Sequence, residues 1–234
     1  MDLERRGMTE RIPDAHWNAI RAACDDIRTF PARATLSRQA EPLDRSLLLL
    51  DGMMSRHVPG PHRDVREMVA IEVPGDFVDL HSFPLGTLDH DVSTLTEVRV
   101  AMFPHANLRR LMQDHPEAGI ALWSMTVTDA AIHRYWSFRI GALRAMGRVA
   151  NFLAEMELRL RLAGLVEDGR FDLPLTQVDL GEACGMTAAH VNRTVRELRE
   201  DGAATLRGGT VTIHDRDRLH RIGQFQPTFL MVET

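Results

Sequence analysis

One segment of this chain carries side chains suited to recognising a partner surface. The segment Gly185–Gly202, GMTAAHVNRTVRELREDG, predicts a helix whose apolar residues Val191, Val195 and Leu198 form one buried stripe. Small and basic residues occupy its other side: Ala188, Ala189, Asn192, Arg193 and Arg196. An arginine guanidinium can donate two parallel hydrogen bonds to a base edge or a phosphate. The outer side of this helix therefore has the chemistry of a nucleic-acid contact.

The residues around this segment predict a helix-turn-helix followed by a hairpin. Thr176 can cap a first helix in LTQVDLGEAC, and Gly185 can adopt the positive φ that ends it. Gly181 is small where the two helices must cross closely, and Thr187 can cap the second helix. The glycine pair in TLRGGTVTI predicts a hairpin, which would form a wing beside the second helix. The buried side of the first helix is expected to hold Leu180, Ala183 and Cys184.

The outer side of the second helix is therefore expected to enter the major groove of double-stranded DNA. The residues expected to contact DNA are Thr187, Ala188, Ala189, His190, Asn192, Arg193, Arg196 and Arg207. Asn192 could pair with adenine or hold a phosphate, and the sequence leaves both roles open.

The spacing of apolar residues divides the rest of the chain into a region of strands and then a region of helices. Pro13 opens a short helix, and from about residue 27 to 104 short apolar runs between Gly, Pro, Asp and His predict antiparallel strands. Helical periodicity then returns and continues to about residue 165. The segment VEDGRFDLP, residues 166–174, resembles a linker.

The helix expected at 116–142 has more apolar surface than one neighbouring sheet can cover. A break near 143–145 is expected to separate it from the next helix. Apolar and small residues at mixed three and four spacing predict a dimer seam. The candidate seam residues are Ile120, Trp123, Val127, Ala130, His133, Ser137 and Ile140. The alternative is that this helix packs wholly against its own domain.

The composition and charge of the chain indicate a soluble globular protein. Hydrophobic residues make up 44% and charged residues 26% of the chain, as in soluble globular proteins. No apolar run is long enough to span a membrane, and the first residues lack the apolar segment of a signal peptide. Cys24 and Cys184 lie far apart without a motif, which indicates a reducing cytoplasm. The net charge of −5 argues against a general polyanion binder but permits a local basic surface.

The stretch from Pro174 to Asp215 resembles the DNA-binding domain of the Crp–Fnr transcription regulators. The strands with a PGD turn, the long helix and GRVANFLAEM resemble this family as well. The resemblance implies an α+β protein with an N-terminal antiparallel β-roll (jelly-roll) sensor domain, 1–115, a long dimerisation helix, 116–142, and a C-terminal winged helix-turn-helix, 143–234. It also implies a homodimer on a two-fold DNA site. RNA polymerase is a further partner if the protein activates transcription, and a small-molecule effector is unidentified.

The same resemblance suggests which bases are recognised. Family members present a glutamate near the start of the second helix and an arginine four positions later. Here Ala189 replaces the glutamate and Arg193 retains the arginine. A guanine is therefore expected in each half-site, with a looser or A·T preference opposite Ala189. Arg196 is expected to meet the DNA backbone.

The strand region departs from the pattern of the cyclic-nucleotide binders. Those members use a Gly-Glu pair and then an Arg-Ser or Arg-Thr pair that holds the cyclic phosphate. Gly75 and Asp76 resemble the first pair, but the stretch HSFPLGTLDHDVSTLTE contains no arginine. Asp89 and Asp91 stand there instead and would repel a phosphate. Cyclic AMP is therefore not expected, and a ligand of this pocket is expected to be neutral or cationic.

No cofactor or metal is expected from the sequence. Cys24 stands alone where iron–sulfur members of the family carry four cysteines. One histidine suffices as an axial haem ligand, and the strand region has four: His57, His62, His81 and His90. Scattered histidines in polar loops are usually solvated, which argues against haem. The segment HDRDRLH, 214–220, predicts a solvated helix start rather than a metal site.

Two other classes of function are alternatives to DNA binding. An enzyme is not expected, because no paired carboxylates, nucleophile–base pair, phosphate loop or HExxH motif stands out. A sensor module that acts through protein contacts is the second alternative. The outward arginines at 193 and 196 favour DNA over a protein partner.

Overall fold

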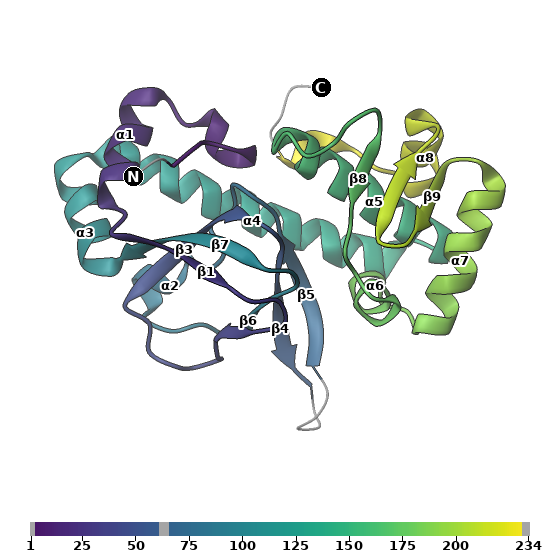
Figure 1. The fold of residues 1–234 in the computed structure, drawn as a ribbon, viewed down its shortest axis with the longest axis horizontal. Coiled ribbons are helices and arrows are strands. Elements are labelled where there is room, and N and C mark those ends of the chain that lie inside the picture. The colour runs from purple at the N-terminus through teal and green to yellow at the C-terminus, as the bar shows by residue number, and fades with distance from the viewer. Residues whose placement is uncertain (1–2, 61–65, 231–234) are drawn as a thin grey trace. The chain divides into compact units, whose positions relative to one another are not determined.

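The computed structural model describes residues 3–60 and 66–230, and it divides into two compact units (Figure 1). The first unit is Met1–Asp129 and the second is Ala130–Thr234. The boundary between them falls inside one long helix, α4 (Pro116–Ala142).

The described part of the first unit contains two antiparallel sheets, four helical segments and the part of α4 up to Asp129. One sheet has the strand order β1-β7-β3 and the other β2-β6-β4-β5. The strands are β1 (Asp26–Phe30), β2 (Thr35–Ser37), β3 (Arg45–Asp51), β4 (Met54–Pro59), β5 (Arg66–Glu72), β6 (Asp91–Thr94) and β7 (Val98–Pro104). The helical segments that precede α4 are η1 (Gly7–Arg11), α1 (Asp14–Ala23), α2 (Ser82–Leu85) and α3 (His105–Asp114). These elements confirm the expected antiparallel β-roll.

The leucine run of β3 explains how the first unit forms two cores. Successive side chains of a strand point to opposite faces. Leu48 and Leu50 accordingly join a core that contains Trp17 of α1. Leu47 and Leu49 join a second core among the strands. One strand thus serves both cores, and for this reason its four central residues are all leucine instead of alternating with polar residues.

The expected turn at VPGDF is present between β5 and α2. Gly75 has a φ of 100°, and a Cβ atom there would lie 2.0 Å from the backbone oxygen of Arg6. Only glycine suits this position, because an L side chain is strained at that φ and would clash. Asp76 accepts a hydrogen bond from the Val73 amide at 2.8 Å, so its carboxylate is part of the turn itself.

The long helix α4 leaves several large apolar side chains exposed. Ile120 is 54%, Trp123 67% and Val127 47% exposed. Toward its end, Phe138 and Ile140 are also exposed. Within the described residues, no helix has both the length and the apolar character needed to cross a membrane.

The second unit is helical with a small three-stranded sheet. After α4 ends at Ala142, the chain resumes as a helix at Ala145, which confirms the expected break. The following elements are α5 (Ala145–Leu162), β8 (Arg170–Asp172), α6 (Gln177–Cys184), α7 (Ala188–Asp201), β9 (Ala204–Arg207), β10 (Thr210–Ile213), α8 (Arg216–Gly223) and η2 (Pro227–Leu230). The sheet has the order β8-β10-β9.

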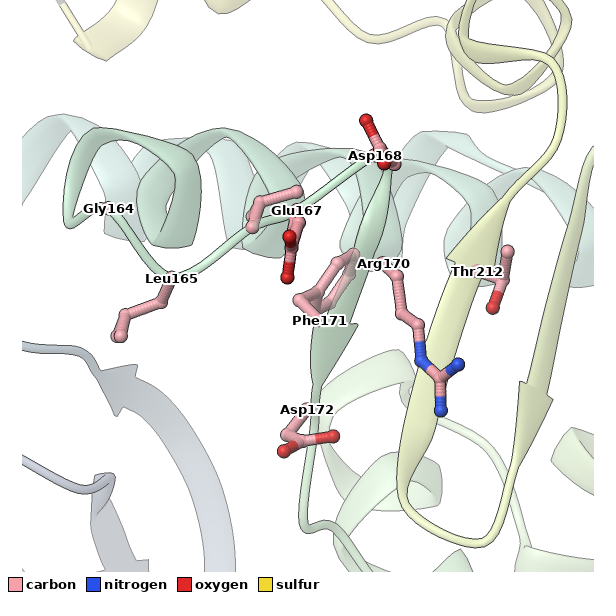
Figure 2. Close-up of a pocket in the computed structure, with 9 residues that line it drawn as sticks. Gly164, Leu165, Glu167, Asp168, Arg170, Phe171, Asp172 and Thr212 are labelled. Carbon is pink, nitrogen blue, oxygen red and sulfur yellow. The ribbon is translucent and has the colours of Figure 1, made fainter.

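The interpretation of residues 166–174 as a linker was wrong. β8 pairs with β10 in antiparallel register, with Arg170 opposite Thr212 (Figure 2). Phe171 is 3% exposed, whereas its neighbours Arg170 and Asp172 face solvent. Pairing with β10 and burial of Phe171 make this segment a strand, although the local composition is that of a loop.

Candidate nucleic-acid interface

The first helix of the expected pair begins with a reciprocal cap. The Thr176 hydroxyl accepts a hydrogen bond from the Asp179 amide at 3.1 Å, and the Asp179 carboxylate accepts one from the Thr176 amide at 2.9 Å. Such a capping box satisfies two amides that the helix itself leaves without acceptors. Leu180, Ala183 and Cys184 are buried, as the sequence predicts.

The turn between α6 and α7 follows the predicted geometry. Gly185 has a φ of 62°, and the Thr187 hydroxyl accepts from the His190 amide at 3.3 Å. A Cβ atom on Gly181 would lie 2.6 Å from the Met186 carbonyl oxygen. The small residue is therefore required by the turn backbone, which crosses closest to α6 at this point. These contacts fix the direction in which α7 leaves the turn.

Two residues outside the motif hold the same turn. The Arg148 guanidinium donates to the Gly185 carbonyl at 3.1 Å and to the Leu143 carbonyl at 2.8 Å. The Ile140 side chain lies against Gly185, with its Cγ2 atom 3.2 Å from where a Cβ would stand. The end of α4 and the start of α5 thus contact the turn directly. Sequence reasoning did not identify Arg148, because no local pattern marks its distant acceptor.

The buried stripe of α7 differs in one position from the sequence prediction. Val191 and Leu198 are buried, but the third fully buried residue is Thr194, while Val195 is only half-buried. Spacing of three and then four places Thr194 at the centre of the stripe. Its hydroxyl donates to the His190 carbonyl at 3.1 Å, so the polar group is satisfied within the helix.

The opposite side of α7 is open. Ala189, Asn192, Arg193 and Arg196 are exposed, and Ala188 and His190 are half-buried. Among the described residues, no ion pair involves Arg193. Arg196 lies 3.8 Å from the exposed Glu200 carboxylate, a weak pair in water. Arg193 is therefore available to contact a partner on this open side.

The hairpin after α7 has the expected glycine turn. Gly208 and Gly209 have φ values of 58° and 82°, the pair of positive angles that a tight two-residue hairpin requires. Arg207 is exposed at the start of this turn, and β8 widens the wing to three strands.

A pocket beside β8 has a different character from the outer side of α7. Figure 2 shows that Glu167, Asp168 and Asp172 contribute three carboxylates to its lining, against one guanidinium from Arg170. Its excess of negative charge would repel a phosphate backbone. DNA is therefore expected at α7 and Arg207 rather than at this pocket.

The end of α4 and the helix α5 share a buried network of charged side chains. Glu155 of α5 accepts hydrogen bonds from Arg139 at 2.9 Å, from Arg159 at 3.1 Å and from the Trp136 indole at 3.2 Å. The Arg139 guanidinium also lies over the rings of Trp136 and Phe152, 4.5 Å and 5.2 Å from their centroids. A sequence pattern would place these charges on the surface, since charged residues are seldom fully buried without partners.

Cys184 is packed in the same interior. Burial raises the pKa of its thiol to about 12. This agrees with the expectation that Cys184 serves packing and not redox or metal chemistry.

Three of the four residues expected in an effector pocket already have side-chain partners within the first unit. Besides Asp76 in its turn, Asp91 accepts from the Gln39 amide at 2.8 Å. Asp89 is exposed and lies 2.7 Å from Nδ1 of His90. Gly75 has no side chain to offer. A ligand bound by all four residues stays a prediction.

Among the described residues, two histidines of the roll are buried and a third is half-buried, contrary to the expectation that they are solvated. His57 and His90 are 3% and 6% exposed, and His81 is half-buried. Burial lowers the pKa of His81 to about 4, and the charges of Arg56 and His90 act in the same direction. The fourth histidine, His62, lies outside the described residues. Tertiary packing encloses these side chains, which the polar local sequence does not indicate.

Residues 214–220 form a helix start, as expected. The Asp215 carboxylate accepts from the Arg218 amide at 2.8 Å and thereby caps α8. The charged side chains of the first turn are exposed.

Comparisons with known proteins agree with this geometry. Residues 147–222 match the model of the Crp-like helix-turn-helix domain. The transcriptional activator protein FnrL of Cereibacter sphaeroides is 31% identical over 146 residues, which are 61% of this chain and 58% of that protein. A CRP-like cAMP-activated global transcriptional regulator of Mycobacterium tuberculosis is 29% identical over 225 residues, 94% of this chain and 97% of that protein.

The fold is also that of a solved structure. FixK2 from Bradyrhizobium japonicum superposes with a TM-score of 0.75 at 23% identity, over 84% of this chain and 96% of that one. This likeness concerns the fold. The chain thus contains a Crp-like helix-turn-helix domain and is similar to transcription regulators of the Crp–Fnr type.

Proposed function

We propose that this chain binds DNA sequence-specifically as a homodimer on a two-fold site and thereby regulates transcription. The observation that carries the proposal is the outer side of α7, where Asn192 and Arg193 are exposed on a helix fixed by two caps and a buried stripe. A rigid helix that presents an uncommitted arginine fork suits the major groove.

The side chains of this surface divide into two kinds of contact. Arg193 suits bidentate recognition of guanine, and the methyl group of Ala189 suits a thymine methyl. Arg196, one turn further along and beside Glu200, suits a phosphate. Arg207 of the wing suits a second phosphate. Specificity would then come from the start of α7, and non-specific affinity from Arg196 and Arg207.

A homodimer follows from the size of the recognition unit. One short helix gives few base contacts, whereas two copies related by a two-fold axis would read half-sites about 34 Å apart. The exposed Ile120, Trp123 and Val127 of α4 form an apolar stripe suited to the seam. Ala130 and Ser137 are exposed, and Ile140 is 38% exposed, on the same helix.

The effector of the roll is inferred to be other than cyclic AMP. No arginine follows the Gly75 turn before Arg99, so the cyclic phosphate would lack its expected partner. We infer a cytoplasmic location from the proposed DNA target. RNA polymerase is the further partner if the protein activates transcription.

Selection of bound sites from a random DNA pool tests the proposal. The unchanged chain is expected to select a two-fold motif with a fixed guanine in each half-site. Arg193→Ala should cost about 1–3 kcal/mol per half-site and relax the guanine preference. Arg196→Ala should weaken all sequences alike and reduce the salt dependence by about one unit per contact.

Arg221→Ala is the matched control, since this exposed arginine lies on α8, outside the helix-turn-helix. It should leave the selected motif unchanged. If Arg193→Ala selects the same motif as the unchanged chain, Arg193 does not read the groove. If the unchanged chain does not retard DNA in a gel, the proposal itself fails.

A further inference from the structure

Three potential metal ligands meet at one end of the β-roll. His81 precedes the short helix α2, and the left-handed Gly86, with a φ of 75°, turns the chain back. Asp89 and His90 stand immediately before β6. One ligand atom from each of His81, Asp89 and His90 can be chosen so that all three lie within 4.8 Å of one another. The two imidazole rings have their centroids 5.2 Å apart.

We propose that His81, Asp89 and His90 bind a divalent transition-metal ion, of which zinc is the representative. Two imidazoles and one carboxylate are a donor set that such ions prefer, and the hard ions magnesium and calcium favour oxygen alone. The site leaves coordination positions for water or a further ligand.

The geometry needs only a small adjustment to hold the ion. Ligand atoms about 2.0–2.1 Å from a tetrahedral zinc ion lie about 3.4 Å apart, so atoms within 4.8 Å of one another must close by at most about 1.4 Å. The Asp89 side chain is 89% exposed and can turn freely. One oxygen of the Asp89 carboxylate is 2.7 Å from Nδ1 of His90. Asp89 would either give up this contact to bind the metal, or bind the metal through its other oxygen and keep the contact, which orients the His90 ring.

The surrounding charges favour a dication. Among the neighbouring charges, Arg56 has the largest effect on the pKa of His81. Arg56 itself forms ion pairs with Glu72 at 2.9 Å and with Asp129 at 2.8 Å. Together with Asp89, these groups amount to one positive and three negative charges, a net of −2. Asp79, which also acts on Arg56, adds no more than one further negative charge. An ion of charge +2 would offset this excess.

Arg56, whose charge acts on His81, also takes part in a contact between the sheet and α4. Arg56 of β4 is 1% exposed and reaches Asp129 of α4 through its Nη1 atom. Burial opposes the charge of this guanidinium, but Glu72 and Asp129 outweigh it and raise the pKa of Arg56. A metal beside this group would change the field around the contact that joins roll and helix. The inference concerns metal binding alone and does not depend on the proposed DNA function.

Metal binding to the purified full-length chain tests the proposal. After removal of adventitious metal with a chelator, zinc is titrated in competition with a chromophoric chelator, and the bound metal is counted by atomic absorption. We expect one ion per chain. His81→Gln and His90→Gln should each weaken binding at least tenfold, and Asp89→Asn about tenfold. Cobalt should give a visible spectrum with the unchanged chain and a changed spectrum with Asp89→Asn.

The matched control is His115→Gln, since this exposed histidine lies between α3 and α4. It should bind zinc as the unchanged chain does. Asp89→Asn keeps the test decisive if a histidine variant fails to fold, because the carboxylate is exposed. Absence of binding at micromolar zinc would overturn the proposal. Equal affinity in the unchanged chain and Asp89→Asn, or an equal loss in His115→Gln, would overturn it as well.

Discussion

Replacing Glu155 by glutamine should destabilise the second unit more than any surface change. The Glu155 carboxylate is the shared acceptor for Arg139, Arg159 and the Trp136 indole. Arg139 is 0% and Arg159 3% exposed, so neither guanidinium can turn to water when the carboxylate charge is removed. Glutamine has the shape of glutamate, but it carries an NH2 group in place of one carboxylate oxygen. That NH2 group donates hydrogen bonds and would face N–H groups that also donate. Breaking a buried ion pair by removing one partner costs about 3–5 kcal/mol.

The free energy of unfolding measured in urea would give this cost, with circular dichroism as the signal. For a unit of this size, about 3–5 kcal/mol corresponds to a fall in the melting temperature by roughly 10–20 °C. Glu200→Gln is the matched control, because its carboxylate is exposed and 3.8 Å from Arg196. It should change stability by no more than about 0.5 kcal/mol. A change below about 1 kcal/mol for Glu155→Gln would refute the view that this network supports the helix pair.

Two further predictions concern the dimer and the thiols. Trp123→Glu should convert the dimer to a monomer at micromolar concentration in sedimentation, because a charge would be buried in the seam. Met112→Glu on α3 is its control, and an unchanged dimer with Trp123→Glu would exclude this seam. In a Cys24→Ser background, Cys184 should react with a thiol reagent only after unfolding, since burial raises its pKa to about 12. Reaction in the folded protein at neutral pH would show that the interior opens.

Local rules account for the parts of the interface that the sequence determined by itself. The Thr176 and Thr187 caps, the left-handed Gly185 and the glycine pair of the wing were all predicted and are all present. Each depends on contacts within about four residues, or on a φ angle that only glycine adopts easily. The open side of α7 followed from the same local periodicity.

Contacts between distant segments decided the rest. β8 is a strand only because β10 pairs with it, through residues 38 positions apart such as Asp172 and Thr210. The full burial of Arg139 depends on Glu155, which lies on another helix.

The three candidate metal ligands are likewise brought together by contacts between distant segments, which the sequence does not indicate. His81 is separated from Asp89 and His90 by a helical turn, and no spacing rule describes that distance. Their proximity and burial come from the packing of the roll around them. Sequence periodicity reports which side of one element is buried, whereas only the folded chain determines which elements, and hence which side chains, meet.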